Sequence, residues 1–188
     1  MKLPILLAAV LLATPSLLLA QATPATPAPA TPAGKPKPLA SSDKTFVKNS
    51  LEGVYFLTQL AEKERGFERD NPVSDNLKKL ARAMGGDGGK IWGEIATVAT
   101  NHGETLPNQL KGSDKTKVAG LGKLKVDKFE KELAELAEKE AKSLLKVFES
   151  GAKSVQHAEL KAIVEKWTAT VKTFADDAAA LAKSAGKK

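Results

Sequence analysis

The chain has 188 residues and a formal net charge of +7, with 29 basic against 22 acidic residues, and it contains no cysteine. The lack of cysteine excludes disulfides, thiol chemistry and metal sites with cysteine ligands. Only three of the basic residues and none of the acidic ones precede Ser41, so the rest of the chain carries a net charge of +4. This excess is small and dispersed, whereas nucleic-acid binders gather basic charge on one face, so we expect no nucleic-acid partner.

Residues 1–22 have the features of a signal peptide. Lys2 supplies a positive start, residues 5–12 form an apolar run, and Ala20-Gln21-Ala22 is a small-x-small cleavage site. Cleavage after Ala20 fits nearly as well as cleavage after Ala22. We therefore expect an exported, periplasmic protein, and association with the outer membrane stays open.

The alternative to a cleaved signal is a membrane anchor, because residues 3–20 are just long enough to span a bilayer. Pro4 and Pro15 interrupt this stretch, and the processing site follows it directly. No later segment approaches the length needed to span, so we expect no transmembrane helix after cleavage.

Residues 23–40 read as a flexible linker, because they consist almost wholly of Ala, Thr, Pro, Gly and Lys. Such a segment cannot bury a core and favours polyproline II, in which it would reach on the order of 50 Å. The alternative is a contact with a wall or membrane surface through Lys35 and Lys37. Residues 41–188 then form one domain of ordinary size.

The first helix is expected over residues 42–65, with Ser42 as its N-cap, and the second over residues 74–101. Four glycines at 85, 86, 88 and 89 lie in the middle of the second helix. The apolar spacing keeps its phase across them, so we expect a continuous, kinked or loosened helix rather than a break. We expect these glycines to admit a bulky neighbour such as Trp167 or Phe174. The spacing of a phosphate-binding P-loop is not met, because Ile91 follows Lys90.

A polar connection over residues 104–125 follows, with a short helix expected near residues 116–124. A third helix is expected over residues 126–150, with Gly151 as its stop signal, and a fourth over residues 154–185. Glu135–Lys139 and Glu138–Lys142 on the third helix indicate a solvated face. The predicted fold class is all-α, a four-helix bundle with one long crossover connection.

Four stretches of the sequence carry a family resemblance: Asp43-x-x-Phe46 with Leu51-Glu52-Gly53, Leu80-Ala81-Arg82-Ala83-Met84 with Asp87, Leu106-Pro107, and residues 129–148 followed by Leu160-Lys161-Ala162. In this order and spacing the chain resembles the exported, ferritin-like bundle family known as domain of unknown function 4142. Members of that family are often labelled predicted outer-membrane or periplasmic proteins.

The resemblance implies a set of possible metal ligands that this chain lacks. The family usually has His where this chain has Gly88, Ala141 and, by alignment, Phe174, and a Glu where residues 54–57 are apolar. None of these replacements offers the imidazole or carboxylate donors that iron, manganese or zinc require. Small Gly88 and Ala141 would instead make room for Phe174. We expect a metal-free member of the family.

The remaining candidate residues are sparse. His102 lies at the end of the second helix and His157 near the start of the fourth, and each is isolated in the sequence. Trp92 and Trp167 fall on the apolar stripes, which predicts core positions. Asp176-Asp177 could pair with lysines or attract a cation. We expect no catalytic, cofactor-binding or metal-ligating residues.

These observations favour a non-catalytic, exported helical-bundle protein with a binding, envelope or stress-related role. Its partner would be an envelope protein or surface. One alternative, from the resemblance, is a ferritin-like metal-binding or oxidative-stress protein. Another is a binder of anionic lipid or cell-wall polymer, acting through the basic excess. The oligomeric state stays open.

Overall fold

The computed structural model describes residues 37–185, so the predicted signal peptide and most of the predicted linker lie outside the described residues. Within this range the chain is all-helical, with five helices and no strand. The helices are α1 (Ser41–Glu68), α2 (Asp75–Asn101), α3 (Gly112–Leu121), α4 (Val126–Ser154) and α5 (Ala158–Ala185). None of them combines the length and the apolar character that crossing a membrane requires.

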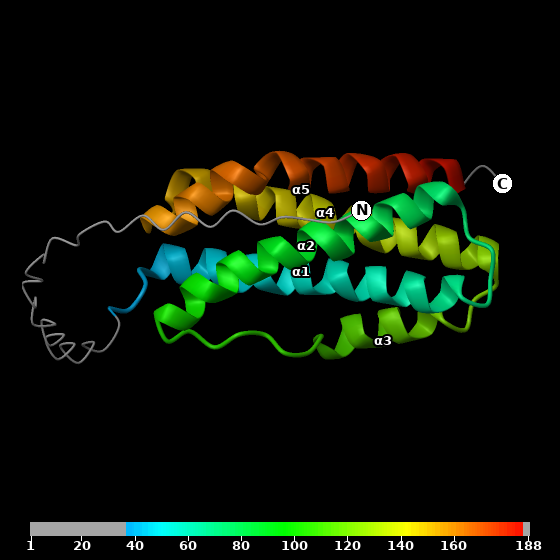
Figure 1. Ribbon diagram of the computed structural model, residues 1–188, viewed down its shortest axis with the longest axis horizontal. Helices are drawn as coiled ribbons and strands as arrows, with labels where there is room; N and C mark the ends of the chain where they lie inside the picture. Colours follow the sequence, from blue (N-terminus) through cyan, green and yellow to red (C-terminus); the bar gives the residue numbers. More distant parts are fainter. Residues whose placement is uncertain (1–36, 186–188) are drawn as a thin grey trace, which may run out of the picture. The chain divides into compact units, whose positions relative to one another are not determined.

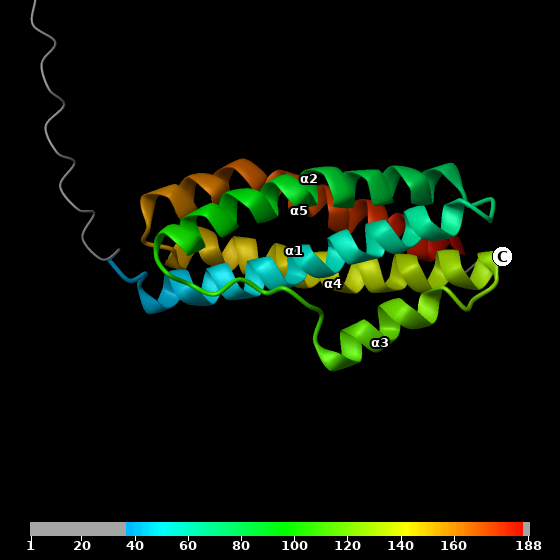
Figure 2. The ribbon, with the colours of Figure 1, turned by 60° about the horizontal axis from the view of Figure 1, so that its bottom comes forward.

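The four long helices surround one core, and each packs against two others (Figure 1). α1 packs against α2 and α4, and α5 packs against α4 and α2. α1 and α5 run in one direction, and α2 and α4 run in the other. Because α2 and α4 are parallel, their connection must return along the length of the helices. That connection carries α3, which lies outside α1 and α4 (Figure 2).

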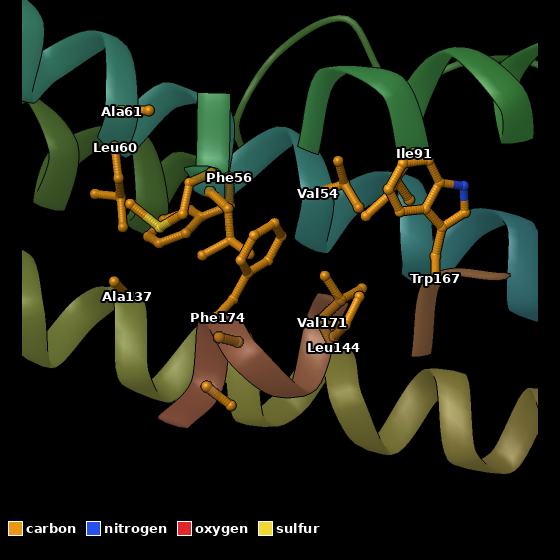
Figure 3. Close-up of a cluster of buried hydrophobic side chains, with 14 of the residues drawn as sticks. Val54, Phe56, Leu60, Ala61, Ile91, Ala137, Leu144, Trp167, Val171 and Phe174 are labelled. Atoms are coloured by element: carbon orange, nitrogen blue, oxygen red, sulfur yellow. The ribbon is translucent and has the colours of Figure 1, made fainter. Parts of the chain in front are cut away.

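The interior is filled by apolar side chains from all four long helices (Figure 3). Leu51, Met84, Phe129 and Phe174 are among the largest, and each is at most 2% exposed. Each such side chain stabilises the fold by about 1.5–3 kcal/mol relative to its exposed state. The core begins before α1, because Leu39 is also buried in it.

The start of the first helix differs from the prediction. α1 begins at Ser41 after Ala40, and no side chain caps it, so the predicted cap at Ser42 is wrong. Ser42 lies inside the first turn, where its own backbone is already helical. α2 begins at Asp75, within one residue of the predicted start, and Ser74 is its N-cap, with an Oγ that accepts the N–H of Leu77 at 3.4 Å.

The glycine-rich stretch does not interrupt α2, so the expected continuous helix is confirmed. The expected neighbours are wrong. A Cβ atom on Gly88 would lie 3.3 Å from Thr58 Cγ2, and one on Gly85 would lie 3.4 Å from Ala61 Cβ, whereas Phe174 is not within 4 Å of either. These two glycines therefore let α1 approach α2 closely.

Gly151 is not a stop signal, because α4 continues through it to Ser154. It is buried, and a Cβ atom there would lie 2.7 Å from Cδ2 of Phe46. Its role is the close packing of α4 against the Phe46 ring of α1. Because α4 is longer than predicted, α5 begins later than predicted, at Ala158. Separately, α3 begins earlier than predicted, at Gly112.

Candidate functional site

The start of α1, the end of α2 and the turn between α4 and α5 meet at one end of the helices (Figure 1). This arrangement brings together the only two histidines of the chain. The ring centroids of His102 and His157 are 4.7 Å apart, and the rings meet edge to face with an interplanar angle of 80°. The two histidines are isolated in the sequence, but the helical topology brings their rings together.

His102 is fixed at the C-terminus of α2. Its backbone N–H bonds to the carbonyls of Ala99 and Thr100, and Gly103 follows in the left-handed region, with φ of 75°. That conformation favours glycine and ends helices. The ring Nδ1 lies 2.6 Å from the carbonyl oxygen of Lys37. Since a carbonyl oxygen only accepts, Nδ1 carries the hydrogen, and in the neutral ring Nε2 keeps its lone pair.

His157 is the residue immediately before α5. Its carbonyl accepts the N–H of Lys161 at 3.0 Å. Its own N–H and that of Gln156 point to Oδ1 of Asp43, at 3.4 and 2.7 Å. Its ring Nδ1 is buried and has no hydrogen-bond partner within the described part of the chain.

Asp43 organises this end from the first turn of α1. Its side chain is only 2% exposed, and its carboxylate meets the free backbone N–H groups at the start of α5, where the helix dipole favours negative charge. The sequence analysis did not single it out as a site residue. A signal existed, because Asp43 lies three and four residues before Phe46 and Val47 and so shares their inward face.

A pocket of about 420 Å³ opens beside the two imidazoles. Its lining residues are Lys37, Pro38, Leu39, Ala40, Asp43, His102, Gln156 and His157. An ion pair between Lys44 and Glu104, 2.8 Å apart, also links α1 to the segment after α2. The site therefore combines two imidazoles, a carboxylate and an amide at the junction of three chain segments.

The positions where the family resemblance implies ligands lie elsewhere, in the interior between the long helices. Gly88 is buried, Ala141 is 0% exposed and Phe174 is 2% exposed. Val54 and Leu57 of α1, in the stretch where the family has a Glu, are each 1% exposed. Figure 3 shows Val54 and Phe174 among the side chains that fill this region. The interior here is packed hydrocarbon.

Glu140, next to Ala141, is partly buried and lines a separate pocket of about 120 Å³ under the α2–α4 connection. Burial raises the pKa of its carboxyl, and the carboxylates of Asp114 and Glu52 raise it further against Lys117 and Lys139. Glu52 is itself paired with Lys111 at 2.5 Å.

The two tryptophans differ. Trp167 is 8% exposed and belongs to the core, as predicted, and its Nε1 donates to Glu94 at 2.8 Å. Trp92 is only partly buried and packs against the core from its edge, so its predicted core position is not met in full. Asp176 pairs with Lys172 at 2.6 Å on an exposed surface, which fits the expected lysine pairing.

Between residues 37 and 185, no group of three or more His, Asp or Glu side chains is arranged to hold a metal ion. The histidine pair therefore offers two possible metal ligands rather than three. Its distinguishing feature is that three separate segments of the chain meet there. We refer to His102, His157, Asp43 and the pocket beside them as the histidine end.

Comparisons with known proteins give a family and a fold. A search of curated proteins finds no match. The crystal structure of a DUF305 fragment from Deinococcus radiodurans is similar, with a TM-score of 0.63 and 13% sequence identity, over 80% of this chain and 99% of that chain. At this identity the likeness concerns the fold alone. The family model "Domain of unknown function (DUF4142)" matches residues 28–181, so the chain belongs to the DUF4142 family.

Proposed function

We propose that this protein is an exported, non-catalytic helical-bundle protein of the cell envelope that acts by binding a partner. The observation that carries the proposal is the packed interior, in which Gly88, Ala141 and Phe174 are all buried among apolar side chains. Helical bundles perform redox and hydrolytic chemistry with inward-pointing His, Glu and Asp. Here the corresponding positions contribute only packing.

We further propose that the long helices form a ferritin-like four-helix bundle with one long crossover. The directions of the helices support this assignment, because α1–α2 and α4–α5 are antiparallel pairs joined by a connection that returns along the bundle. α3 is then a short helix within the crossover, packed against α1 and α4 from outside. The proposed relation is one of architecture and does not extend to the metal chemistry.

Metal analysis tests the non-catalytic assignment. The mature chain is purified without a tag from cells grown with added iron and manganese, and its metal content is measured. We expect neither metal near one equivalent per chain. A content of iron or manganese near one equivalent would overturn the proposal. If that metal is lost on Glu140→Gln but retained in a His102→Gln/His157→Gln double variant, the site uses the Glu140 carboxylate and not the histidine end.

A groove between α1 and α4 supports a binding role. It has a volume of about 550 Å³, and Lys146 is the charged residue among its lining side chains. The other lining residues are uncharged and rich in hydroxyl groups: Ser41, Ser42, Thr45, Phe46, Asn49, Ser143, Val147, Ser150, Gly151 and Ser154. Such a surface suits a neutral partner with hydrogen-bonding groups, such as a peptide backbone or a glycan.

Site-specific crosslinking tests this role. A photoreactive residue at Ser150, in the groove, is compared with one at Thr173, which is exposed on α5. In intact cells we expect a defined crosslinked product from position 150 and none from position 173. Equal labelling from both positions, or no product from either, would contradict binding through this face.

Fractionation tests the export. The full chain is expressed with its own leader in a Gram-negative host, and the mass of the periplasmic product is determined. We expect a chain that begins at Gln21 or Thr23. An uncleaved chain retained in the membrane fraction would support the anchor alternative instead.

A further inference from the structure

We propose that His102 and His157 form a two-imidazole binding site for a divalent late transition metal ion, with Zn²⁺, Ni²⁺ and Cu²⁺ as the class of ligand. The site lies at the histidine end, apart from the bundle interior. It does not rest on the proposed function, which is argued from the packed core and from the groove between α1 and α4. Imidazole nitrogen is a preferred donor for these ions, and the chain has no cysteine or further histidine that could compete.

The first argument is the orientation of His102. Its Nδ1 donates to the Lys37 carbonyl at 2.6 Å, so the ring is held by a backbone acceptor while Nε2 keeps a lone pair. Metal-ligating histidines usually have this arrangement, because the hydrogen bond fixes the tautomer and makes the ring a better donor.

The second argument is the unsatisfied nitrogen of His157. Its Nδ1 is buried without a hydrogen-bond partner in the described part of the chain. A buried polar atom of this kind calls for a ligand, an ion or a rearrangement that satisfies it. Because Nδ1 makes no hydrogen bond, the ring can turn about its Cβ–Cγ bond without breaking a hydrogen bond at that atom.

The third argument is the distance between the rings. With metal–nitrogen bonds of about 2.0–2.1 Å and a tetrahedral angle, the centres of two imidazoles on one ion lie about 5 Å apart. The observed separation is 4.7 Å. The edge-to-face arrangement requires the His157 ring to turn, and the pocket of about 420 Å³ beside it gives the room.

Two charged residues also line the pocket. The carboxylate of Asp43 accepts the backbone N–H groups at the start of α5, and Lys37 is an exposed residue that contacts His102 through its backbone carbonyl. Glu104, near the end of α2, is already paired with Lys44. Water or the Gln156 amide would complete the coordination, since no third His, Asp or Glu joins the pair in the described residues. We therefore expect weaker binding than at a site with three protein ligands.

Calorimetric titration of the tag-free mature chain with ZnCl₂, NiCl₂ and CuCl₂ at neutral pH tests the proposal. We expect one ion per chain, with the affinity reduced at least about tenfold by His102→Gln or His157→Gln. Glutamine can still donate a hydrogen bond, which limits damage to the fold. Asp176→Asn, which changes an exposed carboxylate on α5, is the matched control and should bind as the unchanged protein does.

A second measurement keeps the test valid if a variant folds poorly. In the unchanged protein with ¹⁵N-labelled histidine, we expect Zn²⁺ to shift the ring nitrogen signals of both residues, and MgCl₂ to shift neither, because Mg²⁺ prefers oxygen ligands. Histidine signals that do not shift at millimolar Zn²⁺ would overturn the proposal. Unchanged Zn²⁺ affinity in a variant with both His102→Gln and His157→Gln would also overturn it.

Discussion

Asp43 in the first turn of α1 accepts the backbone N–H of Gln156 at 2.7 Å, although the two residues are 113 positions apart in the sequence. Asp43 is 2% exposed, so the accepting side of this hydrogen bond is shielded from bulk water. This hydrogen bond ties the start of the first helix to the turn that precedes the last helix. It also sets the position of His157, the next residue, whose N–H points to the same oxygen.

Asp43→Ala should destabilise the fold by about 1–3 kcal/mol, because the two backbone N–H groups at the start of α5 lose their acceptor and stay partly buried. Urea denaturation followed by circular dichroism measures the effect. Asp75→Ala is the control, since Asp75 also lies in a first turn but is fully exposed and accepts only a 4.0 Å contact from Lys78. A loss no larger than that of Asp75→Ala would contradict the proposed role of Asp43.

Gly151→Ala should also destabilise, although alanine has a higher helix propensity than glycine by about 1 kcal/mol. The new Cβ would lie 2.7 Å from Cδ2 and 2.9 Å from Cε2 of Phe46, and that ring is held edge to face against Phe148. Overpacking of this kind costs about 1–3 kcal/mol. The measurement is the urea midpoint.

Gly89→Ala is the matched control for Gly151→Ala. Gly89 also lies in the interior of a long helix, but a Cβ atom there meets nothing within 4 Å. We expect Gly89→Ala to stabilise by up to about 1 kcal/mol, because it adds helix propensity without a contact. If both variants shift the urea midpoint in the same direction, the contact between α4 and Phe46 does not explain the glycine at position 151.

The long helices were predictable because their apolar residues recur at helical spacing, and this periodicity depends on local sequence alone. The continuity of α2 followed from the same signal, since Met84, Gly88 and Ile91 keep the phase of the stripe. The reason for the glycines was not predictable. A single sequence shows that Gly88 and Gly151 are small, but which neighbour requires the space depends on the packing of α1 against α2 and α4.

The histidine end could not be predicted for a related reason. His102 and His157 carry no local motif, and their meeting depends on which helix ends lie at the same end of the fold. Asp43 did carry a signal, as a charged residue on an apolar face. Recognising its role required the position of the α4–α5 turn, which the sequence analysis placed too early.

Glu64 should make the stability fall as the pH rises. It is 3% exposed, and burial raises the pKa of its carboxyl. The carboxylate of Glu68 raises this pKa further, and the two effects together outweigh the lowering by Lys78, Arg82 and Arg65. The folded state therefore binds this proton more tightly than the unfolded state. Stability is lost as the pH rises through the folded-state pKa, and the penalty persists at neutral pH.

Glu64→Gln removes this titration. The stability of the variant relative to the unchanged protein should increase as the pH rises from the unfolded-state pKa of a glutamate to the raised folded-state pKa of Glu64. Urea midpoints at several pH values measure the change. Glu62→Gln, the same substitution on the exposed side of the same helix turn, is the matched control. Parallel profiles for Glu64→Gln and the unchanged protein would show that the Glu64 pKa is not raised.

Glu94 should have the opposite pH dependence. Burial raises the pKa of its carboxyl, but hydrogen bonds from Lys166 at 2.5 Å and from Trp167 at 2.8 Å outweigh this effect, so the pKa is lowered overall. A carboxyl with a lowered folded-state pKa stabilises the fold above its unfolded pKa, and this contribution is lost as the pH falls through the folded pKa.

A double-mutant cycle isolates the ion pair within this contact between α2 and α5. Glu94→Gln keeps an acceptor for the Trp167 N–H but loses the charge, and Lys166→Met removes its partner. The Glu94 side chain is 34% exposed, so we expect a coupling of at most about 1 kcal/mol at neutral pH and low salt. The coupling should shrink below about pH 4 and in high salt, because protonation or screening removes the attraction. A coupling that is unchanged at acidic pH would mean that the Lys166 contact does not depend on the charge of Glu94.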